Sequence, residues 1–333
     1  MLDLLARNIQ FSITIFLLIA SLLVLIATII ITKGEQNNLL FLIGISISTS
    51  MLATSLVQII ELVTEKIEKR SNQRSFLRLF GCDDKTNGNG SIAIIIPAFV
   101  LNQNNSQQAG NTLKQQAQNL VWRLSSNAAI KNDVTAASSF VSAFSRLGLP
   151  VPQIKWDEEI KLNDDDGIKT YILIGLSNNV IQFVNQSTER YFSISQNLDK
   201  NNNLSEILIK AGFFDNYKQL VDETRWISNS VLLDSTSHPK NDVDYALFGK
   251  FRINSKVFVI CGGGTEWGTH NIGIHMSDSG WRRVYYDLKR EKGDHLTANE
   301  AFAVVFQVPI NKPSERISIV HKCIRRKKEL TRP

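Results

Sequence analysis

A glycine-rich element that follows an apolar run is the part of the sequence whose residues best suit ligand chemistry. The run Val257–Cys261 leads into Gly262-Gly-Gly-Thr-Glu-Trp-Gly-Thr269 and then into a stretch with helical character. Glycines let backbone amides approach an anion closely, and the first turn of a following helix adds unpaired N–H groups and partial positive charge. The element therefore predicts a phosphate-binding loop, with a tight turn that binds no ligand as the alternative.

Each residue type in this element suits one part of a nucleotide. The loop amides would hold phosphate, the threonine hydroxyls would donate hydrogen bonds, and the indole would stack on a base or simply cover the loop. The spacing is neither that of a P-loop nor the Gly-x-Gly-x-x-Gly of dinucleotide-binding domains. The ligand-binding residues predicted here are Gly262, Gly263, Gly264, Thr265, Trp267, Gly268 and Thr269.

Two further positions are predicted to lie near this loop. Ser177, Asn178 and Asn179 follow the apolar run Thr170–Ile174 and precede a helix, so they place amides and short polar side chains at a helix N-terminus. Asp244 stands before an apolar run that a short turn joins to the glycine strand. Its carboxylate is therefore expected close to the loop, and a capping or turn role is the alternative.

Catalytic and metal-binding patterns are not found in the sequence. The histidines form no His-Glu-x-x-His motif, and no serine lies in a Gly-x-Ser-x-Gly elbow. The three cysteines have no paired spacing, which fits a reducing compartment. The run Asp164–Asp166 reads as a solvated turn. We therefore expect no catalytic residue, no metal and no cofactor.

The run Cys261–Met276, CGGGTEWGTHNIGIHM, resembles the glycine signature of SLOG-type Rossmann-like domains through its Gly-Gly-x-x-x-Gly-Thr element. That resemblance implies a domain that senses or processes nucleotides. Two N-terminal spans joined to such a domain are also similar in layout to membrane effectors of bacterial nucleotide-signalled antiviral systems. What this implies is a nucleotide signal that triggers assembly and membrane disruption.

The elements that must position these residues alternate between strands and helices. This alternation predicts an α/β domain, a Rossmann-like and mostly parallel sheet covered by helices. A helix is expected over Asp133–Leu147, with Asp133 as its N-cap and Gly148 at its end. The expected strands are Ile92–Ile96, Thr170–Ile174, Tyr245–Arg252, Val257–Cys261 and Phe302–Val308.

Residues 1–62 predict a transmembrane helical hairpin. Residues 9–32 and 38–60 contain no charged side chain, and each stretch is long enough to cross a hydrocarbon core of about 30 Å. Five basic residues follow the second span, whereas the connection between the spans has only Lys33, offset by Glu35. The positive-inside rule then predicts an inner-membrane, multi-pass protein whose termini and large domain are cytoplasmic.

The remaining organisation follows from composition. Residues 63–81 continue with helical periodicity until Gly81, residues 82–90 form a linker, 91–321 form the α/β domain, and 322–333 are a basic tail. In the second span a stripe of small residues, Gly44, Ser48 and Ser55, predicts close helix packing. This packing would lie inside the hairpin, between subunits of a homo-oligomer, or both.

The sequence therefore favours a membrane-anchored sensor–effector that binds a nucleotide or cyclic nucleotide signal, acts in the lipid bilayer and assembles as a homo-oligomer without nucleic acid. One alternative is a membrane-tethered hydrolase of nucleotides with Asp244 or Glu266 as base. Another is a scaffold whose tail, Lys322–Arg332, binds lipid or nucleic acid.

Overall fold

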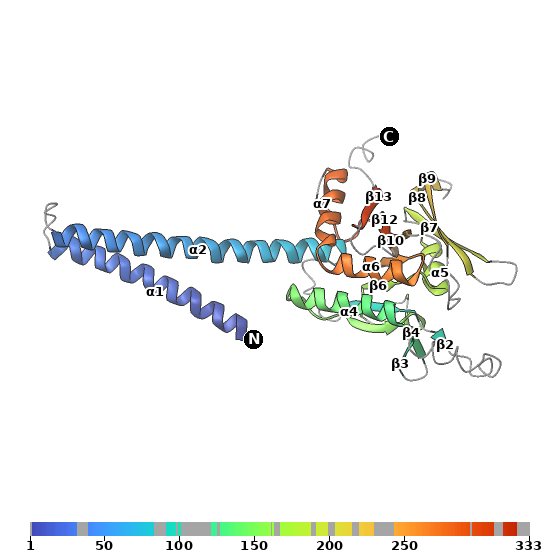
Figure 1. Cartoon of the computed structure of the whole chain (residues 1–333), viewed down its shortest axis with the longest axis horizontal. Helices are drawn as coiled ribbons and strands as arrows, with labels where there is room; N and C mark the ends of the chain where they lie inside the picture. The colour runs from blue at the N-terminus through green and yellow to red at the C-terminus, as the bar shows by residue number, and fades with distance from the viewer. Residues whose placement is uncertain are drawn as a thin grey trace. The chain divides into compact units, whose positions relative to one another are not determined.

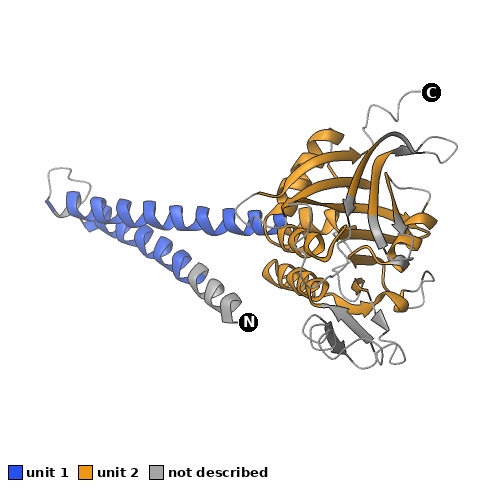
Figure 2. Ribbon diagram, turned by 45° about the vertical axis from the view of Figure 1, so that its right-hand side comes forward, with its two compact units in different colours: residues 1–72 blue, residues 73–333 orange. Residues whose placement is uncertain are grey.

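The chain divides into two compact units, residues 1–72 and 73–333 (Figure 2). The structure is a computed structural model. It describes residues 2–31, 39–82, 91–97, 99–100, 121–124, 127–160, 162, 167–187, 191–198, 204–214, 220–229, 243–293, 295–309 and 316–324.

The first unit contains two long helices, α1 (Leu2–Ile31) and most of α2 (Leu39–Leu79) (Figure 1). Both are long and apolar enough to cross a membrane. Large apolar side chains such as Phe16, Leu23 and Ile60 are exposed on these helices, as suits contact with lipid rather than with a protein core. The two apolar helices predicted from the sequence are therefore present.

Four small polar residues are buried where the two helices pack together. Thr14, Ser21, Ser48 and Ser55 are buried. The Thr14 hydroxyl donates to Gln58 Oε1 at 3.3 Å, and a Cβ added to Gly44 would lie 2.5 Å from the Thr28 side chain. The small stripe of α2 is thus used for packing inside the hairpin.

The second unit is built on a seven-stranded mixed sheet. Three neighbouring pairs, β11 with β6, β6 with β1 and β1 with β5, are parallel, and the other three pairs are antiparallel. Five of these seven strands point the same way, which confirms the predicted α/β class and mostly parallel sheet. In sheet order the strands are β13 (Ser318–Ile324), β12 (Phe302–Pro309), β10 (Val243–Ile253), β11 (Lys256–Gly263), β6 (Thr170–Ile174), β1 (Ile92–Ile96) and β5 (Gln153–Trp156).

Alternate residues of the central strands enter two cores, one on each face of the sheet, because successive side chains of a strand point to opposite faces. In β1, Ile94 packs with α4 (Lys131–Arg146), α6 (Glu266–Ser277), α7 (Gly280–Lys292) and the end of α2. Its neighbour Ile95 packs on the opposite face with α5 (Asn178–Gln186) and a second sheet. Both faces of the sheet are therefore covered.

The last turns of α2 belong to the core of the α/β unit. Phe76 and Phe80 are fully buried, and Phe76 lies edge-on to Trp281 of α7 at a centroid distance of 5.3 Å. The helix ends before Gly81, as predicted, and Gly81 has φ of 74°. The second compact unit begins at residue 73, so it includes this helix end. The sequence predicted that the α/β domain begins only at residue 91. Residues 83–90 of the predicted linker lie outside the described residues.

Several elements were not predicted. Two three-stranded sheets accompany the main one, β2 (Phe99–Val100), β4 (Asn127–Ile130) and β3 (Val121–Leu124) in one, and β7 (Phe192–Leu198), β8 (Leu204–Phe214) and β9 (Leu220–Asn229) in the other. A short 3₁₀ helix, η3 (Asp157–Glu159), follows β5. The prediction for Asp133 was wrong in detail, because α4 starts at Lys131 and Asp133 is its third residue rather than its N-cap.

Candidate functional site

The parallel strands place most of the predicted site residues along one edge of the sheet. The chain leaves β1 to return through α4 to β5, and it leaves β6 through α5 on the opposite face. In open α/β sheets, ligands bind outside the carboxyl ends of the strands where neighbouring connections diverge in this way. The residues that follow β1, β6 and β11 at this edge are therefore the first candidates for a site.

The predicted glycine loop is divided between three elements. Gly262 and Gly263 are the last residues of β11, Gly264 and Thr265 form the bend, and α6 begins at Glu266. Trp267, Gly268 and Thr269 therefore lie in the first turn of a helix and not in a loop. Thr265 is the N-cap of α6, and its hydroxyl accepts a hydrogen bond from the Gly268 amide at 3.2 Å.

The glycines of this element are explained by close packing. A Cβ at Gly262 would lie 2.7 Å from the Gly175 carbonyl carbon, and one at Gly263 would lie 2.5 Å from the Gly268 carbonyl carbon. A Cβ at Gly268 would overlap the Asp244 carboxylate. The run of glycines thus lets β11, α6 and the end of β6 approach one another, which removes the argument that so many glycines require a ligand.

An internal carboxylate occupies the place expected for a phosphate. Asp244 at the start of β10 is buried, and its Oδ2 accepts hydrogen bonds from both the amide and the hydroxyl of Thr265 at 2.9 Å. The Gly263 amide donates to Thr269 Oγ1 at 3.0 Å, and the Gly264 amide donates to the Tyr245 carbonyl at 3.0 Å. The amides predicted to hold phosphate are paired within the protein.

The first turn of α6 keeps binding capacity. Among the described residues none accepts a hydrogen bond from the amides of Glu266 and Trp267, the first two residues of the helix. These N–H groups carry the partial positive charge of the helix N-terminus. The Trp267 side chain is 48% exposed, and its ring lies edge-on to His270 at 6.4 Å. An anion and a flat ring system would both find partners here.

Asp133 is a buried residue at the same edge whose carboxyl group has no partner among the described residues. Its residue is 4% exposed, and no described residue forms a hydrogen bond or ion pair with it. Its oxygens lie 3.5 and 3.6 Å from the position that a Cβ would take at Gly175, just beyond β6. Burial, and to a lesser degree the negative charge of Glu266, raise the pKa of Asp133 to about 7. Asp133 therefore lies close enough to the start of α6 to interact electrostatically with it.

Three titratable groups with shifted pKa values meet around this turn. Burial raises the pKa of Glu266 and lowers the pKa of His270. Glu266 and His270 are four residues apart on α6, so they share one side of the helix. His270 Nδ1 is buried and has no hydrogen-bond partner. Clusters of perturbed groups of this kind are typical of functional sites.

Ser177 and Asn179, which were predicted to lie near the glycine loop, form structural contacts instead. Ser177 is the N-cap of α5, and its hydroxyl donates to Asp157 Oδ2 at 3.1 Å. The Asn179 amide donates to the same Asp157 oxygen at 3.1 Å. Asn178 is the first residue of α5, and its side chain lies outside the described part. Ser177 and Asn179 therefore join α5 to η3.

Sequence reasoning missed the acid that now stands out. Asp133 was assigned to a helix cap, and Glu266 entered only as a candidate base. A signal was present for Asp133, since an acid at the start of an apolar helix that packs on the sheet must be either exposed or buried at a cost. The described residues contain no cluster of three or more groups that suits a metal ion. The run Asp164–Asp166 and residues 325–333 of the basic tail lie outside the described part, while Lys322 is in β13.

Comparisons with protein-family models, with curated proteins and with solved structures give no match to the chain. The site must therefore be interpreted from its own geometry.

Proposed function

We propose that the chain is a membrane-anchored sensor–effector whose α/β domain binds a nucleotide-type signal at the first turn of α6. The observation that carries this proposal is the group of Asp133, Glu266 and His270 at this turn, in which the buried residue Asp133 has no partner among the described residues and the buried His270 Nδ1 has none either. A buried polar group without a partner costs about 1–3 kcal/mol, so its presence calls for an explanation such as a ligand that completes it.

The groups around the turn match the parts of a nucleotide. The amides of Glu266 and Trp267 would donate hydrogen bonds to a phosphate, and the exposed indole of Trp267 would stack on the base. The carboxyl groups of Asp133 and Glu266 would accept hydrogen bonds from hydroxyl or amino groups. This assignment moves the phosphate from the amides of Gly263 and Gly264, which already donate to Thr269 Oγ1 and to the Tyr245 carbonyl, to the helix N–H groups next to them. Gly262–Thr269 then support the site through packing.

The membrane unit would carry the response. Both helices are of spanning length, and α2 extends without interruption from the second candidate span to residues buried in the domain core. We propose that the ligand has different affinities for two assembly states of the spans, since only such a difference lets it shift their equilibrium. This proposal includes a cytoplasmic orientation of the domain, a homo-oligomer and a role in antiviral defence. The orientation comes from the charges that flank the spans. The antiviral role comes from the resemblance of Cys261–Met276 to SLOG-type domains.

The test uses the full chain in lipid nanodiscs with a panel of mono-, di- and cyclic nucleotides, followed by native mass spectrometry for bound mass, product mass and subunit number. We expect one nucleotide class to bind without turnover and to change the subunit number. Glu266→Gln and Trp267→Leu should each weaken binding about tenfold or more, which corresponds to the loss of one charge-assisted hydrogen bond or one stacking contact. Binding of no nucleotide, or equal binding by all variants, would refute the proposal.

Matched controls separate loss of the site from general damage. Glu158→Gln changes an exposed acid of η3, and Tyr286→Leu changes an aromatic residue of α7 that is 55% exposed. Both should bind the nucleotide as the unaltered protein does. Trypsin digestion of sealed vesicles of known orientation would show whether the α/β domain faces the cytoplasm.

A second candidate function is hydrolysis of a nucleotide at the same turn. It is favoured by the raised pKa of Glu266, which brings a carboxyl group toward the range useful for acid–base chemistry, and by the lowered pKa of His270, which keeps the imidazole neutral and able to accept a proton. Asp244 is a poor base by comparison, because its Oδ2 accepts two hydrogen bonds from Thr265. Product formation that Glu266→Gln abolishes would establish this second function.

A further inference from the structure

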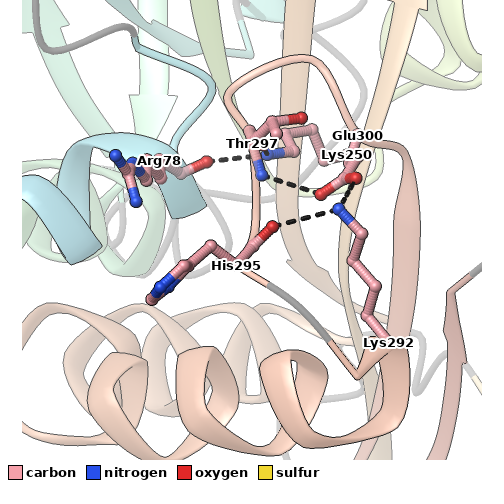
Figure 3. Close-up of polar contacts among 6 residues, drawn as sticks. All are labelled: Arg78, Lys250, Lys292, His295, Thr297 and Glu300. Atoms are coloured by element: carbon pink, nitrogen blue, oxygen red, sulfur yellow. Dashed lines mark hydrogen bonds and ion pairs between the residues drawn. The ribbon is translucent and has the colours of Figure 1, made fainter. Parts of the chain in front are cut away.

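A buried lysine holds the end of α2 at the opposite edge of the sheet. Lys250 of β10 is fully buried. Its side-chain nitrogen, Nζ, donates to the carbonyl oxygen of Arg78 at 2.7 Å and to that of Thr297 at 3.2 Å, and it lies 5.2 Å from the centre of the Phe302 ring. Figure 3 shows the lysine between the last turn of α2 and the connection that follows α7. One side chain therefore joins three elements of the domain.

The turn that Lys250 contacts is a complete helix end. The Cys82 amide donates to the Leu77 carbonyl at 2.8 Å, and the Gly81 amide donates to the Arg78 carbonyl at 3.2 Å. This pair of bonds, with Gly81 in the left-handed region, is a Schellman motif. The Arg78 carbonyl accepts from both Gly81 and Lys250, at the helix terminus that carries partial negative charge. Lys250 is thus bonded to the atom that closes α2.

The charged groups around Lys250 do not neutralise it. Lys292 forms an ion pair with Glu300 and also donates to the His295 carbonyl at 3.0 Å (Figure 3). Glu300 is therefore occupied, and no described carboxylate bonds to Lys250. Burial lowers the pKa of Lys250 to about 7, a fall that the neighbouring Cys82 opposes and that Lys292 increases. Burial also raises the pKa of Cys82 to about 11, so its thiol is uncharged at neutral pH.

We propose that Lys250 is a proton-sensitive joint that holds the last turn of α2 in the α/β domain and loosens when it gains a proton. A neutral amine has two N–H donors, and two carbonyl groups receive them. A proton adds a third N–H and a full charge next to Lys292, and no carboxylate of the described residues is free to neutralise that charge, so burial makes the cost large. Release of the helix end lets the lysine reach water and lowers that cost.

The consequence concerns the whole of α2, because this helix is continuous from the second candidate span to Leu79. Proton uptake would determine whether the end of that helix is held by the domain. The inference requires no ligand at the carboxyl edge, so it stands or falls separately from the proposed function.

The experiment is hydrogen exchange of the full chain in nanodiscs between pH 6 and pH 9, with rates corrected for the intrinsic pH dependence of exchange. The amides of Phe80, Gly81 and Cys82 report the helix end. The pKa of Lys250 is lower when the end of α2 is held than when it is released, so the held state binds fewer protons. The held state is therefore favoured as pH rises above about 7. Protection should increase by at most about tenfold per pH unit between pH 7 and pH 9.

Two variants identify the group responsible. Lys250→Met keeps the length of the side chain and removes the titrating amine, so its protection at these amides should not depend on pH. Lys256→Met is the matched control, because Lys256 is a lysine of β11 that is 1% exposed and whose Nζ donates to the Tyr171 hydroxyl at 3.4 Å. It should keep the pH dependence of the unaltered protein.

The outcomes decide in both directions. Loss of the pH dependence in Lys250→Met alone supports the joint. Protection of the unaltered protein that does not change between pH 6 and pH 9 overturns it, and this measurement remains valid even when Lys250→Met fails to fold. The same slope in Lys250→Met as in the unaltered protein also overturns it.

Discussion

Buried charged residues lie at both ends of the strands of the seven-stranded sheet, and β10 supplies one of them at each end. At the carboxyl edge of β11, β10 supplies Asp244, and six residues later, about 20 Å along the strand, it supplies Lys250 at the other edge. Asp244 and Lys250 both have their hydrogen bonds completed by neighbouring residues. Asp133, at the carboxyl edge, does not.

The difference shows that burial of a polar side chain alone does not identify a functional group. Asp244 is as deeply buried as Lys250, and each joins elements of the fold: Asp244 holds the start of α6, and Lys250 holds the end of α2. Asp133 joins nothing among the described residues. This contrast is why a binding role is proposed for Asp133, whereas Asp244 and Lys250 are interpreted as groups that hold elements of the fold together.

The largest effect on stability is expected from Gly268→Ala. The added methyl group would overlap the Asp244 carboxylate and separate it from Thr265, at a cost of about 3 kcal/mol in the free energy of unfolding. Thermal unfolding of the α/β unit, followed by near-ultraviolet circular dichroism, measures this. Alanine is the better helix former, so helix propensity alone predicts the opposite sign.

Gly293→Ala provides the scale for that result. Gly293 has φ of 78° and open space around a Cβ, so its substitution should cost only the left-handed conformation, about 1 kcal/mol. An equal effect of the two variants would show that the glycine element is not closely packed. It would restore the ligand explanation for the glycines and weaken the contrast between Asp244 and Asp133.

Asp133→Asn should stabilise the protein at pH 8 by about 1–3 kcal/mol, because it removes a buried carboxylate without a partner. The pKa of Asp133 is raised in the folded state, so its contribution to stability is present at low pH and is lost as pH rises from about 4 to about 7. The advantage of the variant should therefore shrink toward pH 4. Denaturation at several pH values, compared with the unaltered protein, measures it.

Lys250 makes the stability of the protein depend on pH with the opposite sign to Asp133, and in a different pH range. Its folded-state pKa is lowered, so its contribution is lost as pH falls from about 10.5 to about 7. Asp133→Asn should leave this upper window unchanged. If the substitution instead destabilises the protein at pH 8, Asp133 has a structural partner, and the proposal that it contacts the ligand is refuted.

The sequence was enough to locate the main strands, and it failed where charge is set by tertiary packing. Ile92–Ile96 and Thr170–Ile174 were predicted with the bounds that the structure has, because continuous apolar runs of this length suit strands buried on both faces. The antiparallel β7, β8 and β9 were missed, because polar residues interrupt their apolar pattern.

The candidate site was predicted only in part, for a physical reason. Glycine and threonine around β11 have a local signature, so Thr265 could be expected to begin a helix. That Asp244 would accept the hydrogen bonds of Thr265 depends on the register of β10 against β11, which no local pattern specifies. Asp133 and Lys250 each look like ordinary surface residues until the fold buries them. The groups that distinguish the two edges are therefore the ones that sequence reasoning identifies least well.

Thr170→Val is expected to have the smallest effect, and it tests which contacts hold the end of α2 in the domain. The Thr170 hydroxyl donates to the Gly81 carbonyl at 3.2 Å and lies 3.8 Å from the Cys82 sulfur, so it is a second contact to the end of α2. Valine keeps the shape and removes both the bond to Gly81 and the weak bond from the Cys82 thiol, which together should cost about 0.5–1.5 kcal/mol. Exchange at Gly81 and Cys82 should become faster at every pH by a similar factor, because a hydroxyl does not titrate in this range. A change in the pH slope itself would show that Thr170, through Cys82, shares the proton-dependent control assigned to Lys250.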